Sequence, residues 1–190
     1  QGKTTQVRVD GEDEVFSVRG FTAWSIADAA NRYFERDLLK VEPGTVDSVT
    51  VQRPGQAPIA FKKLEDGTWT LLSLAEGQKL DQTATNTFLT KLLTVRIVDP
   101  VSATATPEMG LDGPAATVVS WTTPGGAPTR YRIGAAVPEK TNRLYLQSDT
   151  KPFVVEVVTS SVDNAVTKPT DPLIAAPGAE EPEVFDLDAP

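Results

Sequence analysis

The 190-residue chain contains neither cysteine nor histidine. Without cysteine it can form no disulfide, no thiolate nucleophile and no cysteine-ligated metal site. Without histidine it lacks the commonest general base near neutral pH and the commonest transition-metal ligand. We therefore expect no metal and no cofactor, and any acid–base machinery would have to be built from carboxylates.

Other patterns are missing as well. No apolar run approaches the roughly 18 residues of a membrane-spanning helix, so we expect no direct membrane insertion of this segment. The formal net charge is −8 and there is no long basic stripe, which argues against nucleic acid as a partner. Phosphate-loop and Gly-x-Ser-x-Gly patterns are absent. Because the sequence begins with Gln1 rather than Met, we expect it to be a piece of a longer protein.

The first forty residues combine a strand pattern with a helical pattern. Apolar and polar residues alternate over residues 7–9 and 15–18, on either side of a polar turn at residues 10–13. This pattern predicts a β-hairpin. Apolar residues then recur at helical spacing over residues 25–35, which predicts a helix.

The remainder of the chain is mainly typical of β structure. Residues 46–72 contain three short strand patterns separated by glycine turns, which predicts a meander. Asp81 is the expected cap of a second helix over residues 82–94. A loop-rich stretch covers residues 100–114, and a short helix is expected within residues 160–166. Four more strands are expected at residues 118–122, 130–133, 144–146 and 153–158.

These elements predict an α+β fold. It would consist mainly of antiparallel β-sheets, built from meanders and hairpins, with two main helices packed on them and one short C-terminal helix. Four segments are expected along the chain. They are a hairpin plus helix that ends a preceding repeat unit (1–40), a β-meander plus helix (41–100), a four-stranded antiparallel segment plus short helix (101–176) and a flexible acidic tail (177–190).

The two ends of the chain carry a similar pattern. A strand pair, a helix and Leu38-Leu39 follow one another near the start, and the same order returns about 135 to 138 residues later, ending at Leu173-Ile174. One reading is a long internal repeat, of which the chain begins and ends at equivalent points. The other is a chance likeness, because hairpins followed by helices are common. The oligomeric state stays open, since an incomplete unit could close on itself or pair with a second copy.

Several short motifs, taken in order, resemble a known family. They are Arg36-Asp37-Leu38-Leu39, Gly67-Thr68-Trp69-Thr70-Leu71, Gly110-Leu111-Asp112-Gly113-Pro114 and Tyr131-Arg132-Ile133-Gly134. Together they are similar to the bacterial domain-of-unknown-function family numbered 4340, over most of residues 5–175. The Gly-Leu-x-x-Pro and Ile-Gly elements are the most specific parts of the resemblance.

The resemblance implies a place and a kind of partner rather than a reaction. Members of the family look like extracytoplasmic proteins tethered by an N-terminal membrane segment, and they are often encoded beside ABC-type transport systems like those of gliding motility. For this chain the resemblance implies the periplasm or the cell surface, a tether outside the given sequence, and a protein partner in the envelope such as a transporter component. It implies no catalytic residue, because the family has no established active site.

Aromatic side chains supply the candidate partner-binding residues. Phe21 and Trp24 lie three residues apart just before the predicted first helix. They would either pack over the start of that helix or form an exposed aromatic patch for a partner. Trp69 and Trp121 fall in strand patterns and are expected to be core residues.

Other candidates have structural interpretations that suffice. Gly110, Gly113 and Gly134 would supply backbone conformations closed to other residues, and Pro114 would fix the entry into a strand. The carboxylates of residues 10–14 could form a glycosidase pair or a weak calcium site, but an exposed hairpin turn offers neither burial nor rigidity. A third set, Arg32, Arg36 and Asp37, is explained by the dipole of the helix that it would end.

The sequence therefore favours a non-catalytic, extracytoplasmic module that binds or braces a protein partner. One alternative is a carrier or substrate-binding domain for a small or polymeric ligand, which would show a deep aromatic pocket with a few convergent polar groups. Another is a carboxylate-dependent hydrolase, which would show two carboxylates of divergent pKa in one cleft.

Overall fold

The computed structural model describes residues 4–20, 35–151 and 153–175, which form two units. The first unit ends at Arg36 and contains an antiparallel hairpin of β1 (Thr4–Arg8) and β2 (Val15–Arg19), as the alternating pattern predicted. The helix predicted over residues 25–35 falls almost wholly outside the described residues, and so does the acidic tail.

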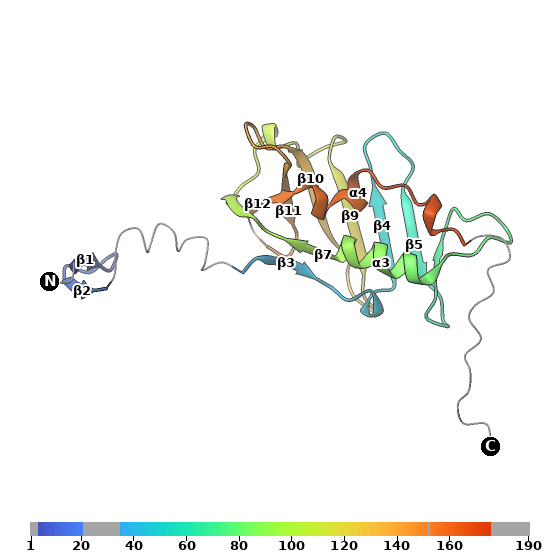
Figure 1. Ribbon diagram of the computed structural model, residues 1–190, viewed down its shortest axis with the longest axis horizontal. Helices are drawn as coiled ribbons and strands as arrows, with labels where there is room; N and C mark the ends of the chain where they lie inside the picture. The colour runs from blue at the N-terminus through green and yellow to red at the C-terminus, as the bar shows by residue number, and fades with distance from the viewer. Residues whose placement is uncertain (1–3, 21–34, 152, 176–190) are drawn as a thin grey trace, which may run out of the picture. The chain divides into compact units, whose positions relative to one another are not determined.

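The second unit, which begins at Asp37, is built on one antiparallel sheet of eight strands (Figure 1). In spatial order the strands are β6 (Trp69–Leu71), β5 (Ile59–Lys63), β4 (Ser48–Gln52), β9 (Thr117–Thr122), β10 (Thr129–Ala136), β11 (Arg143–Ser148), β12 (Val154–Val158) and β8 (Asp99–Ser102). The predicted meander makes one half of this sheet and the four later strands make most of the other. Pairing of β4 with β9 joins the two halves, so segments 41–100 and 101–176 share a sheet.

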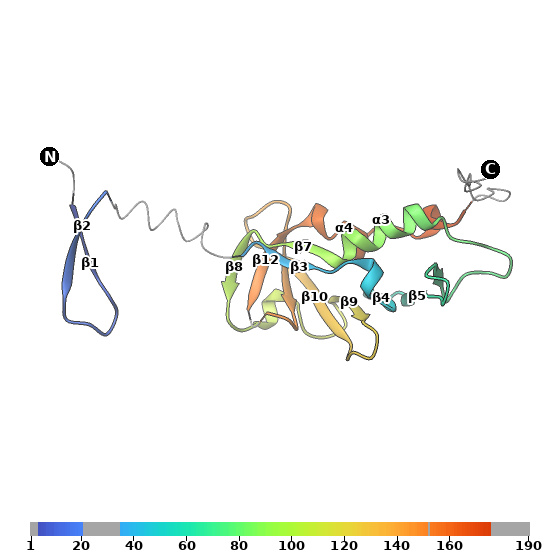
Figure 2. The same cartoon turned by 90° about the horizontal axis from the view of Figure 1, so that it is seen from below.

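Helices and a short ribbon cover one face of this sheet (Figures 1 and 2). They are α3 (Gln82–Leu93), α4 (Asp163–Val166) and the antiparallel pair of β3 (Asp37–Lys40) with β7 (Thr94–Arg96). The described residues of the unit also contain four 3-10 turns, namely η1 (Pro43–Thr45), η2 (Pro107–Met109), η3 (Thr159–Ser161) and η4 (Asp171–Leu173).

The second predicted helix is present where its cap and apolar stripe placed it. The Asp81 carboxylate accepts a hydrogen bond from the Ala84 amide at 2.9 Å, which satisfies one of the free donors at the start of α3. Phe88, Leu89, Leu92 and Leu93 are buried along one side of the helix. The Phe88 ring lies 5.7 Å from the ring of Phe61 on β5, so this stripe packs directly on the sheet.

Alternation along the central strands explains why the main core lies on one face of the sheet. Val119 and Trp121 of β9 are buried, while Val118 and Ser120 between them are only partly buried. Because neighbours in a strand point to opposite faces, the buried set faces the helix layer and the partly buried set faces away. The buried Tyr131 of β10 donates its hydroxyl to the Leu92 carbonyl at 2.9 Å, which ties the sheet to α3.

A smaller core lies on the opposite face, near β12. Met109, Leu111 and Val154 are buried together, with Ala105 and Tyr145 packed against them. The chain after β8 therefore folds back over this end of the sheet. Here β12 is buried on both faces, which is why its sequence is a nearly continuous apolar run.

Two sequence predictions need correction. Residues 100–102 lie in the stretch predicted as loop, but together with Asp99 they form edge strand β8, where Pro100 is tolerated because an edge strand can spare a backbone donor. Residues 37–40, placed at the end of the first helix segment, form β3, which pairs with β7 by long-range contact. The described residues contain one long helix, α3, and one short helix, α4, and the other main helix was expected over residues 25–35, almost wholly outside the described residues.

Candidate functional site

The hairpin β1–β2 carries an exposed apolar face. Its register pairs Val7 with Phe16 and Thr5 with Val18, so these four side chains share one face. Phe16 is 47% exposed and Val18 is 37% exposed. The candidate partner residues Phe21 and Trp24 follow directly, but they lie outside the described residues. A surface of this kind suits apolar docking better than chemistry.

The acidic turn of the same hairpin is exposed, as predicted. Residues 10–14 are all exposed, and the Glu12 amide donates to the Val9 carbonyl at 3.1 Å within the loop. Nothing holds the carboxylates at a set separation around a buried space, so the turn lacks the geometry of a glycosidase pair. Across the parts of the chain that the structure describes, no three acidic, histidine or cysteine residues gather as a metal site.

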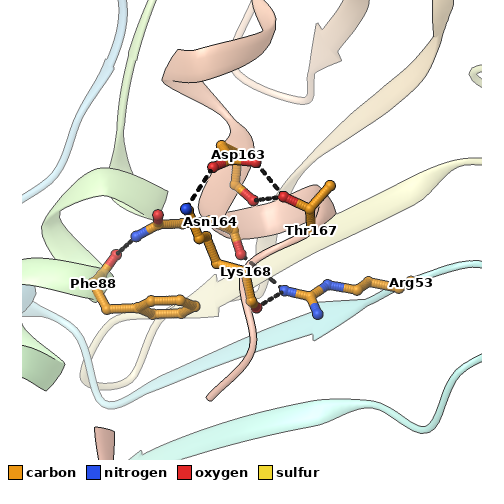
Figure 3. A network of polar contacts seen from close by, with 6 residues as sticks. All are labelled: Arg53, Phe88, Asp163, Asn164, Thr167 and Lys168. Carbon is orange, nitrogen blue, oxygen red and sulfur yellow. Dashed lines mark hydrogen bonds and ion pairs between the residues drawn. The ribbon is translucent and has the colours of Figure 1, made fainter. Parts of the chain in front are cut away.

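The most extensive polar network surrounds Arg53, next to the end of β4 (Figure 3). Arg53 is buried, with only 6% of its surface exposed. Its Nε donates to the Ala165 carbonyl at 2.8 Å, and its Nη2 donates to the carbonyls of Asn164 at 3.0 Å and Lys168 at 2.5 Å. A guanidinium thus caps the C-terminal end of α4, where the helix leaves carbonyl groups unpaired.

Two side chains of α4 complete this network. Asp163 accepts from the Thr167 hydroxyl and forms an ion pair with Lys168 at 3.3 Å (Figure 3). The hydrogen bond from Thr167, helped by Lys168, holds the pKa of Asp163 below its ordinary value. The Asn164 amide donates to the Phe88 carbonyl of α3 at 3.3 Å. The network therefore fastens α4 to β4 and α3, and burial lowers the pKa of Arg53 with partial compensation from Asp163.

A second charged cluster lies at the other end of the sheet. Glu156 of β12 is 5% exposed, and its Oε1 accepts from Lys140 Nζ at 2.7 Å. That hydrogen bond raises the pKa of Lys140. Glu156 Oε2 and Arg143 Nη1 are buried and have no hydrogen-bond partner within residues 4–20, 35–151 and 153–175. The ion pair of Lys140 with Glu156 holds the turn between β10 and β11 against β12. In this turn Glu139 and Asn142 have left-handed φ values of 60° and 62°.

A hollow of about 290 Å³ lies beside edge strand β6. Its lining includes Trp69, Asp66, Gln78 and Lys79. The Gln82 amide spans the strand edge above it, accepting from the Trp69 amide at 2.7 Å and donating to the Trp69 carbonyl at 3.0 Å. The indole of Trp69 is itself buried, so the hollow offers no open aromatic surface for stacking.

Comparison with known proteins identifies the family. The model of the family described as "Domain of unknown function (DUF4340)" matches residues 1–114 of the 190. The chain belongs to this family. No curated protein and no solved structure matches it.

The DUF4340 match covers the hairpin, the meander and α3, and it ends at Pro114, just before β9. Arg53 lies inside the matched range, whereas the α4 carbonyls that it binds lie beyond it. Glu156 and Lys140 lie beyond it as well. Over the described residues of this DUF4340 chain, no helix is long and apolar enough to span a membrane.

The remaining predicted residues have structural places. Trp69 and Trp121 are buried core residues, as predicted. Gly110 and Gly113 adopt left-handed φ values of 61° and 92°, as predicted. Gly134 does not, and its role is different: a Cβ there would collide with the Met109 carbonyl of η2, so glycine is needed because two backbones approach closely. Of the set at residues 32–37, Asp37 forms an ion pair with Arg96 at 3.3 Å, Arg36 belongs to no helix, and Arg32 lies outside the described residues.

Sequence reasoning missed both charged clusters. The acceptors of Arg53 are backbone carbonyls more than a hundred positions away, and no residue pattern marks them. Glu156 did carry a signal, because a single carboxylate interrupts the apolar run Val154-Val155-Glu156-Val157-Val158. A charge within a strand buried on both faces needs a partner of opposite charge.

Proposed function

We propose that this DUF4340 chain is a non-catalytic binding and scaffolding module that engages a protein partner through the hairpin β1–β2. The observation that carries the proposal is the exposed apolar face of a hairpin that belongs to a different unit from the eight-stranded sheet. A two-stranded hairpin is marginally stable alone in water, and burying Phe16 and Val18 against a partner would stabilise it.

The proposal extends to the place where the module works. We propose an extracytoplasmic location, in the periplasm or at the cell surface, with a membrane tether outside residues 1–190. The partner would be an envelope protein, such as a component of an ABC-type transport system. What supports this part is the resemblance carried by the Gly-Leu-x-x-Pro and Ile-Gly elements.

The engagement of the charged groups favours binding over catalysis. Arg53 is committed to backbone carbonyls and Glu156 to Lys140, so each holds elements together. The carrier alternative has one observation in its favour, the hollow beside β6, whose polar Asp66 and Lys79 could meet a small ligand. The hydrolase alternative would need two carboxylates that share a cleft and differ in pKa, and the shifts seen at Asp66 and Asp163 are both downward.

Position-specific photo-crosslinking tests the proposal. A photoreactive phenylalanine analogue is placed at Phe16 in the full-length protein within its native cells, and the same analogue is placed at Ser17 as a matched control. Phe16 and Ser17 are adjacent but point to opposite faces of the hairpin. We expect an adduct with an envelope protein from position 16, at least five-fold stronger than from position 17. Equal yields from both positions, or no adduct from position 16, would contradict a docking role for this face.

A further inference from the structure

The hairpin β1–β2 has a counterpart within the second unit. Five residue pairs join β1 to β2, from Thr4↔Arg19 to Arg8↔Val15. Five pairs join β11 to β12, from Arg143↔Val158 to Gln147↔Val154. Every residue of the second set carries the number of its counterpart plus 139. The two hairpins therefore share one register over their whole length.

Their loops match too. Each innermost pair encloses a loop of the same length, residues 9–14 in one hairpin and residues 148–153 in the other. In the first loop the Glu12 amide donates to the Val9 carbonyl at 3.1 Å. In the second the Lys151 amide donates to the Ser148 carbonyl at 3.3 Å, at the same two positions. Register in a hairpin follows loop length and turn geometry, and the two loops share their length and this hydrogen bond, although Gly11 has a left-handed φ of 88° and its counterpart Thr150 does not have a positive φ.

The same alignment relates the faces. The apolar face of β1–β2 corresponds to the face of β11–β12 that packs under the helix layer. In number order Thr5, Val7, Phe16 and Val18 correspond to Leu144, Leu146, Val155 and Val157. Leu146, Val155 and Val157 are wholly buried, whereas Phe16 is 47% exposed and Val18 is 37% exposed. Three of these four positions are thus wholly buried in the second unit, whereas Phe16 and Val18 are exposed in the first.

The surroundings of β11–β12 show what such a hairpin requires. Strand β10 pairs with the outer side of β11, and strand β8 pairs with the outer side of β12. Within the described part of the chain, β1 and β2 pair only with each other. No described strand therefore pairs with the outer side of β1 or β2, and Phe16 and Val18 of the apolar face are exposed.

We propose that β1–β2 is a strand-addition element that completes the sheet of a separate unit with the fold of the second unit, one that lacks its own counterpart of β11–β12. A strand like β10 pairs with β1, a strand like β8 pairs with β2, and the helix layer of that unit covers Val7, Phe16 and Val18. Main-chain hydrogen bonds on both sides of the hairpin supply affinity, and burial of the apolar face fixes the register in which the strands pair. The inference deepens the proposed function by naming the partner of the same surface.

A graft tests the equivalence without the partner. In the full chain, residues 143–158 are replaced by the sequence of residues 4–19, which has the same length and places Val7, Phe16 and Val18 on the core face. Thermal unfolding is followed by circular dichroism. We expect a cooperative transition with the melting temperature lowered by about 10 °C, because smaller side chains replace Leu144 and Leu146 and the larger Phe16 replaces the wholly buried Val155.

The matched control shifts the graft by one residue. Residues 143–158 are replaced by residues 5–20, which keeps nearly the same composition but turns Arg8 and Ser17 toward the core. We expect this variant to lose the cooperative transition. If both grafts unfold alike, whether cooperatively or not, the two hairpins are not equivalent and the proposal falls. This outcome is separable from the crosslinking test, which depends on an exposed docking face and not on the register of the graft.

Sedimentation of the unaltered chain tests whether a second copy is the occupant. The second unit already contains β11–β12, so another copy offers no vacant position and we expect a monomer over a hundred-fold range of concentration. A dimer that is lost in Phe16→Asp but kept in Ser17→Asp would assign the apolar face to a second copy and overturn the proposed partner.

Discussion

Arg53 lies almost wholly out of water, and three backbone carbonyls make this burial possible. They belong to residues 164, 165 and 168, at the C-terminal end of a helix of only one turn. A planar guanidinium can serve several acceptors at once, which a lysine ammonium on a flexible stem does less well. At the scale of the residue, the charge therefore acts as a fastener for a helix too short to be stable alone.

Replacement of Arg53 measures this role. We expect Arg53→Met to lower the free energy of unfolding by about 3 kcal/mol, because it leaves buried carbonyls without donors while keeping much of the apolar stem. Arg53→Lys should cost less, since one charged donor remains. Urea unfolding of the three proteins gives both values. A loss under about 0.5 kcal/mol in Arg53→Met would show that solvent satisfies these carbonyls.

At the scale of the elements, the two edges of the eight-stranded sheet differ. Edge strand β6 has its Trp69 amide and carbonyl bound by the side chain of Gln82, which imitates a neighbouring strand. Edge strand β8 is short and contains Pro100, which removes a donor from the edge. Both devices hinder further strands from adding to this sheet. The described strands β1 and β2 contain no proline, which agrees with a role in strand addition.

The contact of η2 with β10 depends on the close approach of the two backbones at Gly134. A Cβ there would collide with the Met109 carbonyl, so we expect Gly134→Ala to lower the free energy of unfolding by about 1 to 3 kcal/mol. Gly44→Ala is the matched control, because Gly44 has open space around its Cβ position and no left-handed φ. Calorimetry of both variants makes the comparison, and equal stabilities would mean that η2 moves aside freely.

At the scale of the whole molecule, stability should be independent of metal ions. The 190 residues contain no histidine and no cysteine, and carboxylates of the described residues form no cluster of three. We expect the melting temperature to be unchanged, within about 1 °C, after dialysis against a strong chelator. A lower melting temperature that is restored by added zinc or calcium would contradict this expectation and reveal a metal site formed by carboxylates.

The sequence by itself determined the local elements of this protein. Period-two alternation and glycine turns gave the hairpin β1–β2, the meander β4–β5–β6 and the later strands, and Asp81 with its apolar stripe gave α3. These signals were sufficient because turns, caps and amphipathic periods act between residues that are near in sequence. The family resemblance rested on motifs of the same local kind, and the family match over residues 1–114 confirmed it.

Only the tertiary structure decided how distant segments meet. The strands β3, β7 and β8 form by long-range pairing. Their short sequences did not predict strands, because β8 contains Pro100 and because β3 and β7 adjoin segments with a helical pattern. The burial of Arg53 and Glu156 depends on carbonyls and a lysine brought together by the fold. The need for glycine at position 134 became clear only from the backbone of η2, which approaches it closely. The likeness of the two chain ends was visible as a pattern, but their common register could be read only from hydrogen-bonded pairs, because register depends on which residues lie opposite one another.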